Sequence, residues 1–327
     1  MTEGTGEGAG SLRVSVITLT YRRPGDLRLA LPAVLEHVEA LPGAELVVVD
    51  NDTEPSARSV VEEYAASHPV RYAHEPRPGI AAARNRGLDE TSQADVVVFI
   101  DDDERPQPGW LTALLDTYRS TGATGVAGRV VSTFDGPVDP WIVAGGFFDR
   151  LRRPTGAPVP VVATNNLLLD ARTIRDWGLR FDETFGLSGG SDTVFGLEVL
   201  QRGGSLVWCD EAVVVDVVPP GRLTRSWVLR RAFRSGNTAS RAAAHVRPGA
   251  AVRVRTGMAG RGVVRLAGGA ARLAAGALQR DARLRARGAR TAARGAGMLL
   301  GSLGYVYSEY RRQPSAVSSS VAPVSRV

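Results

Sequence analysis

The stretch Asp95–Glu104, with the sequence DVVVFIDDDE, determines how the rest of the chain is interpreted. Its apolar residues 96–100 form a run typical of a buried strand in a parallel sheet. Asp101, Asp102 and Asp103 follow directly, where open α/β sheets bind ligands, outside the carboxyl ends of their strands. Neighbouring carboxylates repel one another, and a hard divalent cation with oxygen ligands would offset that repulsion. The position therefore predicts either a metal–diphosphate site or a solvated turn that caps the next helix.

Strands and helices are predicted to alternate around this stretch. The expected strands are 14–19, 45–50, 70–73 and 95–100, and the expected helices are 24–40, 55–67, 80–88 and 109–120. This alternation indicates an α/β fold with a doubly wound, mostly parallel sheet. Right-handed crossovers would then place helices on both faces of the sheet.

The pattern becomes less regular beyond about residue 132. Residues 134–160 are rich in Gly, Pro and aromatic residues, which predicts a loop or lid. Further strands are expected over 161–169, 206–209 and 212–218, and helices over 170–177 and 191–202. The expected division is a disordered terminus at 1–11, an α/β domain at 12–220 whose first half ends near 131, an Arg- and Ala-rich helical extension at 221–312, and a disordered tail at 313–327.

Composition excludes several classes of site. All 40 basic residues are arginine, so the chain has no Walker lysine, Schiff-base lysine or Ser-Lys dyad. Its one cysteine, Cys209, excludes an internal disulfide and a cysteine zinc site. The first ten residues lack the apolar core of a signal peptide, and no segment has the roughly 18 apolar residues of a spanning helix. We therefore expect a cytoplasmic protein.

Charge is distributed unevenly along the chain. Residues 1–218 carry 19 arginines against 32 acidic residues, a net charge of −13, whereas residues 219–327 carry 21 arginines against two acidic residues, a net charge of +19. At 100° per residue from Arg261, eight arginines fall within an arc of about 100°, and Gly268-Gly269 and Gly276 are expected to break this helix into pieces. These arginines are Arg261, Arg265, Arg272, Arg280, Arg283, Arg287, Arg290 and Arg294. The Arg261–Arg294 stripe predicts either a solvated helix face or a surface that binds an anionic membrane.

Polar residues follow three of the early strands, at ends that the predicted topology gathers along one edge. Thr20 and Tyr21 follow the first strand, Asp50 ends the second, and Asp101 and Asp102 follow the fourth. A tyrosine ring can stack on a nucleobase, Asp50 can accept a hydrogen bond from a base N–H, and the later aspartates can hold ribose hydroxyls. The alternatives are that Tyr21 lies at the edge of the core and that Asp50 caps the helix after Pro55.

Two further residues are candidates for the same site. Arg84 lies in a helix entered through Pro78-Gly79, and it could reach a diphosphate, brace the aspartates or lie on the surface. Asp192 lies at the start of the helix expected over 191–202. It is a candidate general base, and a helix cap is the equally simple alternative.

These segments together resemble a known family. The matching motifs are VSVITLTYRRP at 14–24, LVVVDND at 46–52, GIAAARNRG at 79–87, FIDDDE at 99–104, FDETFG at 181–186 and GGSD at 189–192. The set is similar to the inverting glycosyltransferases of family two, which have the GT-A nucleotide-diphospho-sugar fold. The resemblance covers roughly residues 12–245, and the chain departs from the family pattern at Arg22 and Ser191.

The resemblance implies roles for individual residues. Thr20, Tyr21 and Asp50 would bind the nucleobase. Asp101 and Asp103 would form the Asp-X-Asp pair, with Asp103 as the direct ligand of Mg²⁺ or Mn²⁺. Asp192 would be the catalytic base.

The expected activity is inverting transfer of a sugar from a nucleotide-diphospho-sugar to a sugar or lipid-linked acceptor of the cell envelope. The enzyme would act in the cytoplasm, with its basic extension on the inner face of the membrane. Spacing alone leaves a retaining outcome open. The two rival interpretations are a nucleotidyltransferase of similar fold, which would need a basic Gly-rich loop after the first strand, and a nucleic-acid-binding protein. The second is disfavoured because no aromatic platform accompanies the arginines, so we expect no nucleic-acid partner.

Overall fold

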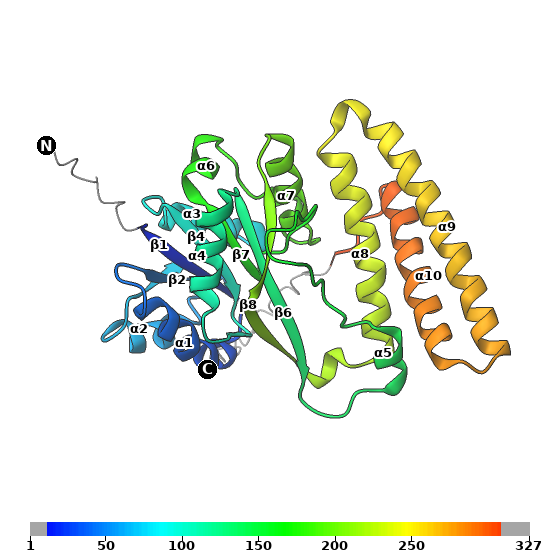
Figure 1. The fold of residues 1–327 in the computed structure, drawn as a ribbon, viewed down its shortest axis with the longest axis horizontal. Coiled ribbons are helices and arrows are strands. Elements are labelled where there is room, and N and C mark those ends of the chain that lie inside the picture. Colours follow the sequence, from blue (N-terminus) through cyan, green and yellow to red (C-terminus); the bar gives the residue numbers. More distant parts are fainter. Residues whose placement is uncertain (1–11, 309–327) are drawn as a thin grey trace, which may run out of the picture.

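The structure is a computed structural model, and it describes residues 12–308. Within this range an eight-stranded sheet has the order β3-β2-β1-β4-β7-β6-β8-β5 (Figure 1). The strands are β1 (Val14–Thr20), β2 (Glu45–Asp50), β3 (Val70–His74), β4 (Val96–Asp101), β5 (Glu104–Pro106), β6 (Gly125–Phe134), β7 (Asn166–Asp170) and β8 (Leu206–Val218). The termini predicted to be disordered, 1–11 and 313–327, lie outside the described residues.

Helices cover both faces of the sheet, as predicted. They are α1 (Pro24–Glu39), α2 (Arg58–Ala65), α3 (Ile80–Glu90), α4 (Trp110–Thr121), α5 (Pro140–Gly145), α6 (Ala171–Asp176), α7 (Ser191–Gln201), α8 (Arg225–His245), α9 (Ala251–Leu278) and α10 (Ala282–Ser302), with short 3₁₀ turns η1 (Glu183–Phe185), η2 (Pro220–Arg222) and η3 (Pro248–Ala250). Alternate residues of β1 separate two cores: Val16 packs with α1, α2 and α4, and Ile17 packs with α3, α6 and α7. The period-2 alternation of strand side chains produces this division.

The first half of the sheet is parallel and the second half is mixed. β4, β1, β2 and β3 pair in parallel, β7 runs antiparallel to both β4 and β6, and β8 is parallel to β6 and antiparallel to β5. The parallel half brings the carboxyl ends of β1, β2 and β4 to one edge. The prediction of a doubly wound α/β sheet is confirmed.

Several elements of the second half differ from the predictions. β6 was not predicted, because Gly125 and Gly128 dilute its apolar pattern; a β-carbon on Gly128 would lie 2.2 Å from Nδ2 of Asn166. The two strands expected over 206–218 are one strand, β8, and the residues 210–212 form an irregularity in its register with β6. The strand expected from residue 161 begins only at Asn166, and the segment 134–160 contains the short helix α5.

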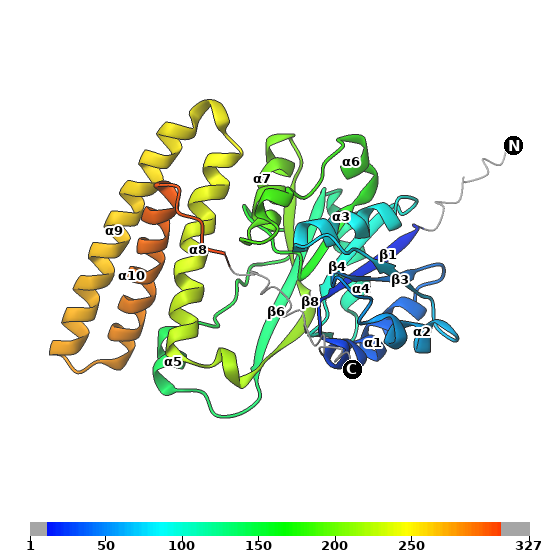
Figure 2. The ribbon, with the colours of Figure 1, turned by 180° about the vertical axis from the view of Figure 1, so that it is seen from behind.

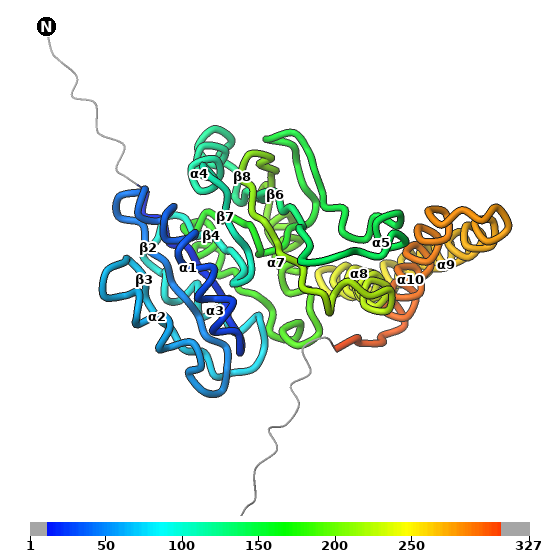
Figure 3. The backbone as a smooth tube through the Cα atoms, turned by 90° about the horizontal axis from the view of Figure 1, so that it is seen from below, coloured from blue at the N-terminus to red at the C-terminus, as the bar shows by residue number. Residues whose placement is uncertain are grey.

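The helices α8, α9 and α10 lie side by side beyond the edge of the sheet (Figures 1 and 2). Seen from below, α9 and α10 are at the opposite end of the molecule from α2 and β3 (Figure 3). The chain reverses between α9 and α10, where Arg280 has φ 55° and the Asp281 side chain accepts a hydrogen bond of 3.0 Å from the backbone N–H of Leu284. The predicted Arg261–Arg294 stripe is therefore not the face of a single helical segment, because the arginines divide between two antiparallel helices that meet at Arg280 and Asp281 and not at the glycines.

The glycines predicted to interrupt this region instead lie within α9. A β-carbon on Gly269 would lie 2.4 Å from the backbone nitrogen of Ala292, and one on Gly276 would lie 2.7 Å from that of Arg285. Both neighbours belong to α10. The missing side chains let the backbones of α9 and α10 approach closely, so glycine is required here by contact between helices.

Candidate active site

The acidic rim, which we define as Asp101, Asp102 and Asp103, lies at the end of β4 beside the end of β1. Thr20 Oγ1 donates a buried hydrogen bond of 2.7 Å to Asp102 Oδ2. The guanidinium of Arg23 lies 3.1 Å from Asp103 Oδ2 and 3.6 Å from Asp102 Oδ1. The structure thus brings together residues that the strand pattern predicted to converge.

The environment of the rim disfavours ionised carboxylates. Burial, reinforced by the charge of Asp103, raises the pKa of Asp101 to about 7. Burial also raises the pKa of Asp102 to about 6, although Thr20 and Arg23 act in the opposite direction. Burial and mutual repulsion disfavour the charged forms of these carboxylates, and a bound cation would stabilise them.

Two further acidic residues adjoin the rim: Glu104, which ends the FIDDDE motif but was not predicted as a site residue, and Asp216. Glu104 on β5 pairs in the sheet with Asp216 on β8. Asn165 Nδ2 donates a hydrogen bond of 2.8 Å to Glu104 Oε1, whereas Glu104 Oε2 is buried with no hydrogen-bond partner among the described residues. Burial and the charge of Asp101 raise the pKa of Glu104 well above its usual range. In the sequence, Asp216 could have been recognised as a candidate site residue because it is an acidic residue inside the apolar run VVVDVV at 213–218.

These residues are chemically suited to a hard divalent cation. Carboxylate oxygens are the ligands that Mg²⁺ and Mn²⁺ prefer. Within residues 12–308 no three such side chains form a ready-made metal cluster. Instead Asp103 faces two arginines, Arg23 and, at 3.7 Å, Arg222. The suitability of these residues for a divalent cation rests on the crowding of Asp101 and Asp103 and on the buried Glu104 oxygen that has no hydrogen-bond partner among the described residues.

A cavity of about 640 Å³ opens over the acidic rim, which is within the size range of small-molecule sites. Part of its lining comes from the ends of β1, β2 and β4 and from the start of α3, namely Leu19, Thr20, Tyr21, Arg23, Asn51, Gly79, Ile80, Ala83, the acidic rim and Glu104. The other lining residues are Phe148, Arg150, Asn165, Leu187, Asp216, Val218, Arg222, Trp227, Arg231 and Arg234. Most of this second set belongs to β8, η2 and α8, and its place at the site was not predicted from the sequence.

The base-side candidates differ in their access to this cavity. Tyr21 lines it, and the Arg22 guanidinium lies 5.3 Å from the centre of the Tyr21 ring. Asp50 is fully buried behind it, where its carboxylate accepts hydrogen bonds from the backbone N–H of Ala57 at 2.8 Å and the hydroxyl of Tyr72 at 3.1 Å. Its neighbour Asn51, which the sequence analysis did not single out, lines the cavity instead.

Arg84 and Asp192 are not among the residues that line the cavity. Arg84 donates a hydrogen bond of 2.6 Å to Ser191 Oγ, and its guanidinium lies 5.4 Å from the centre of the Phe181 ring. Asp192 is half-buried in the first turn of α7, and its Oδ1 accepts a hydrogen bond of 2.7 Å from the backbone N–H of Thr193. Arg84 therefore links α3 to the start of the helix that carries Asp192.

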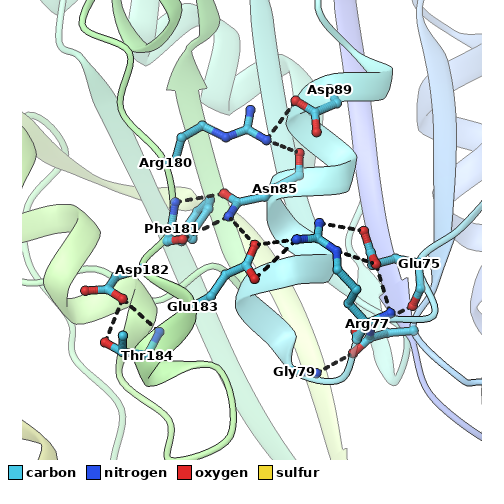
Figure 4. Close-up of polar contacts among 11 residues, drawn as sticks. Glu75, Arg77, Gly79, Asn85, Asp89, Arg180, Phe181, Asp182, Glu183 and Thr184 are labelled. Carbon is cyan, nitrogen blue, oxygen red and sulfur yellow. Dashed lines mark hydrogen bonds and ion pairs between the residues drawn. The ribbon is translucent and has the colours of Figure 1, made fainter.

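The FDETFG segment at 181–186 is tied to α3 by a polar network (Figure 4). Asn85 bonds both backbone groups of Phe181, accepting from its N–H at 2.8 Å and donating to its carbonyl at 2.9 Å. Arg77 bridges Glu75, at 3.0 Å, and Glu183, at 3.1 Å. The network fixes the segment that leads to α7.

The close approach of two glycines completes this attachment. Gly79, at the entry to α3, has φ 122°, and a β-carbon there would lie 3.3 Å from backbone atoms of Gly186. Only glycine adopts this conformation readily and leaves room for the neighbouring chain. The GIAAARNRG and FDETFG motifs thus form one structural unit.

Comparison with known proteins agrees with this architecture. Residues 15–176 match the family model described as glycosyl transferase family 2. The succinoglycan biosynthesis protein ExoM of Rhizobium meliloti is 36% identical over 234 residues, which are 71% of this chain and 75% of that protein. The pre-mycofactocin glycosyltransferase of Mycobacterium tuberculosis is 29% identical over 216 residues, and this chain spans 44% of its length.

Two solved structures share the fold at low sequence identity. The mannosyltransferase PcManGT from Pyrobaculum calidifontis, in complex with GDP-Man and Mn²⁺, superposes with a TM-score of 0.61 at 19% identity, over 89% of this chain and 88% of that one. GalNAc-T7 with UDP, GalNAc and Mn²⁺ gives a TM-score of 0.54 at 14% identity, over 71% of this chain and 51% of that one. With a GT-A type sheet and a relative matched over three quarters of its length, the chain belongs to glycosyl transferase family 2 and is a glycosyltransferase.

Proposed function

We propose that this glycosyltransferase moves a sugar, with inversion, from a nucleotide-diphospho-sugar to a hydroxyl of the acceptor in a reaction that needs Mg²⁺ or Mn²⁺. The observation that carries the proposal is the acidic rim at the carboxyl ends of β1 and β4, open to a cavity of about 640 Å³. The two solved structures of this fold contain a nucleotide and Mn²⁺, which supports the same donor chemistry here.

The donor would lie with its base at the β1 end of the cavity and its diphosphate over the rim. Tyr21 lines that end and offers a ring for stacking, and Thr20 positions Asp102 for the ribose hydroxyls. Asp50 is fully buried, so it would act by holding the strand end and Tyr72 in place. Arg23 faces Asp103 and would also face the diphosphate.

Asp101 and Asp103 would hold the divalent cation, with Asp103 as its direct ligand. The bound cation would supply Lewis-acid stabilisation of the charge on the departing diphosphate. Arg23 and Arg222, which both lie against Asp103, would neutralise the remaining charge of the phosphates. Arg84 would brace this centre from α3 through Ser191.

Asp192 is the proposed general base. It would take the proton of the acceptor hydroxyl, whose oxygen attacks the anomeric carbon on the face opposite the nucleotide, and this route gives inversion. Its Oδ1 is occupied by the N–H of Thr193, so the proton would go to Oδ2. Helix α7 begins at Ser191, four residues after Leu187, which lines the cavity, and this closeness along the chain supports the placement of Asp192 beside the acceptor.

The acceptor is proposed to belong to a cell-envelope polysaccharide or its lipid-linked precursor, on the inner face of the membrane. The similarity to a succinoglycan biosynthesis protein supports this class. The arginines Arg261, Arg265, Arg283 and Arg287 are exposed on α9 and α10, where an anionic membrane surface would attract them. None of the described helices is long and apolar enough to cross a membrane.

The decisive experiment is a panel of nucleotide sugars incubated with the full chain and Mn²⁺, without acceptor. We expect slow hydrolysis of one donor and release of a nucleoside diphosphate, which EDTA abolishes. Release of pyrophosphate from a nucleoside triphosphate would instead support a nucleotidyltransferase. Hydrolysis that is insensitive to EDTA would contradict the metal requirement.

A further inference from the structure

Arg22 has an unusual backbone conformation for an arginine. Its φ is 54°, and within residues 12–308 the only other non-glycine residue with a positive φ is Arg280. A residue with a full side chain adopts this left-handed conformation at a cost, and only glycine, asparagine and aspartate adopt it readily. Arg280 lies just beyond the end of α9, where left-handed residues are common. Arg22 instead follows the strand β1, so a helix end does not account for its conformation.

The side chain of Arg22 is anchored on a buried carboxylate. Its Nε lies 3.1 Å from both side-chain oxygens of Asp52, a residue that is only 5% exposed. Asp52 is itself fixed, because its Oδ1 accepts a hydrogen bond of 2.8 Å from the backbone N–H of Thr53 and its carbonyl oxygen lies 2.9 Å from Nε2 of His74. The Arg22 guanidinium is therefore held against the ends of β2 and β3.

The anchored guanidinium lies over the ring of Tyr21. Its central carbon is 5.3 Å from the centre of that ring, which is within the range of a cation–π contact. Tyr21 lines the cavity of about 640 Å³, whereas Arg22 is not among the lining residues. The guanidinium thus covers one face of the ring, and a base that stacks on Tyr21 would use the opposite face.

Contact with Arg22 affects how much freedom the Tyr21 ring has before a ligand arrives. Without that contact, the half-buried ring would keep more rotamer freedom, which a bound base would have to remove. Ordering a side chain on binding costs free energy, and a ring that is already held in place avoids that cost. Strained residues of this kind gather at binding sites, where the surrounding structure holds them in place. A role in holding Tyr21 therefore accounts for an arginine at this strained position.

Resting on the function proposed above, we infer that Arg22 is a positioning residue for the nucleotide: anchored on Asp52, it holds the Tyr21 ring in the orientation in which the donor base stacks. Arg22 then contributes to the affinity for the base of a nucleoside diphosphate and not to the affinity for its diphosphate. This contribution does not depend on which base is bound, because every base has a face that can stack on an aromatic ring.

The test is calorimetric titration of the full chain, in the presence of Mn²⁺, with UDP, GDP, ADP and TDP, and with pyrophosphate as the counterpart that has no base. Arg22→Asn removes the guanidinium and leaves a residue that adopts the left-handed conformation readily. We expect this variant to bind the nucleotide that the wild-type chain prefers about 3- to 10-fold more weakly. Its affinity for pyrophosphate should equal that of the wild type.

A double-mutant cycle with Tyr21 separates positioning from a general structural role. Tyr21→Ala should weaken nucleotide binding by about 5- to 100-fold through loss of stacking. In the Tyr21→Ala background, Arg22→Asn should cause no further loss, because Arg22 acts through the ring. A further loss as large as that in the wild-type background would show that Arg22 acts through Asp52 or the strand ends, and would overturn the inference.

The matched control is Arg28→Asn, which removes an exposed arginine of α1 that pairs with Glu63 at 2.6 Å and does not line the cavity. It should leave the nucleotide affinity unchanged. If Arg22→Asn does not fold, as judged by circular dichroism, Arg22→Gly replaces it, because glycine adopts a positive φ without a steric cost. Equal nucleotide affinity in the Arg22 variant and the Arg28 control would overturn the inference.

The same titrations distinguish failure of this inference from failure of the donor site. If none of the nucleotides binds the wild-type chain, the proposed donor site is wrong and the role of Arg22 with it. If a nucleotide binds and Tyr21→Ala weakens that binding while Arg22→Asn does not, the donor site stands and the role of Arg22 is wrong. Equal losses of nucleotide and pyrophosphate affinity in Arg22→Asn would assign the guanidinium to the diphosphate and overturn the positioning role.

Discussion

The acidic rim and the helical layer formed by α8, α9 and α10 use charge in opposite ways. The rim contains only three carboxylates, which are buried or half-buried and held by specific bonds, such as the 2.7 Å hydrogen bond from Thr20 to Asp102. In the helical layer, many arginines lie on the surface, while contact between helices depends on bare glycine backbone. A buried, unsatisfied charge costs far more than an exposed one. Single charge changes should therefore have large effects at the site and small effects on the outer helices.

The sharpest test of this contrast is Asp192→Asn. If Asp192 is the base, kcat should fall by about 10²–10⁴-fold while donor binding is retained. Asparagine can still accept the hydrogen bond from the backbone N–H of Thr193 but cannot take the proton. Steady-state kinetics with the donor found in the panel would measure the loss.

Asp281→Asn is the matched control for that variant, because Asp281 caps α10 through Leu284 N–H, far from the cavity. It should leave kcat unchanged. Activity of the Asp192 variant within a few-fold of wild type would show that Asp192 is not the base and only stabilises the first turn of α7.

The next effect is expected for Asp103→Ala. Loss of the proposed direct ligand should remove several kcal/mol of charge stabilisation, so the Mn²⁺-dependent affinity for nucleoside diphosphate should fall by about a hundredfold or more. Calorimetric titration with and without Mn²⁺ checks this. Asp116→Ala, an acidic position on the surface of α4, should change nothing. Unchanged affinity in a folded Asp103 variant would remove this residue from the metal site.

In the helical layer, we expect added side-chain volume to lower the stability of the fold, whereas in the rim we expect loss of a charge to lower binding or activity. Gly269→Ala places a β-carbon 2.4 Å from the backbone of Ala292, whereas Gly268→Ala meets no atom within 4 Å. We expect Gly269→Ala to destabilise the fold by about 1–3 kcal/mol through overpacking. Gly268→Ala should stabilise it by up to about 1 kcal/mol, because alanine favours a helix over glycine.

Urea unfolding of these two neighbouring variants, followed by circular dichroism, measures both signs in one experiment. Equal stability of the two would contradict the close contact between α9 and α10. Donor hydrolysis should persist in both variants, because neither position lines the cavity.

The same contrast explains what the sequence could predict. β1, β2 and β4 are short apolar runs that end in polar residues, so local pattern alone located them and the acidic rim. β6 escaped because its glycines fit against side chains of β7 and β8, which is a nonlocal requirement. The pairing of Glu104 with Asp216, and the placement of Arg231 over Phe148, also depend on contacts between distant segments. The periodicity of apolar residues along the sequence contains no information about such contacts.

The reversal of the chain between α9 and α10 was not predicted, for a different reason. Asp281 is a good N-cap, and Arg280 precedes it in a left-handed conformation that the sequence does not mark, because glycine is usual there. The arginines of 261–294 fall on one side only if the whole segment follows a single helical period, and the reversal at Arg280 and Asp281 breaks that period. In the structure Arg290 is also withdrawn from that stripe, because its guanidinium donates hydrogen bonds to the carbonyls of Gly145 and Gly146 beside α5.

The smallest effect per residue is expected at the exposed arginines of the helical layer. Arg261 and Arg265 on α9, and Arg283 and Arg287 on α10, have exposed side chains and face no cavity. Each should contribute roughly 1 kcal/mol to binding of an anionic membrane at low salt, so replacement of all four by Gln should release the protein from anionic vesicles. Binding should also fall as salt rises, because exposed charges are screened.

Flotation with vesicles of phosphatidylglycerol and phosphatidylcholine, compared with pure phosphatidylcholine, separates charge from nonspecific adhesion. The fourfold variant should lose flotation on the anionic vesicles but keep wild-type donor hydrolysis and thermal stability. Arg290→Gln is the informative counterpart, because Arg290 binds α5 within the molecule. It should lower stability and leave flotation nearly unchanged. If the fourfold variant floats as well as wild type, or if it unfolds while Arg290→Gln does not, the exposed arginines serve packing within the molecule rather than contact with a membrane.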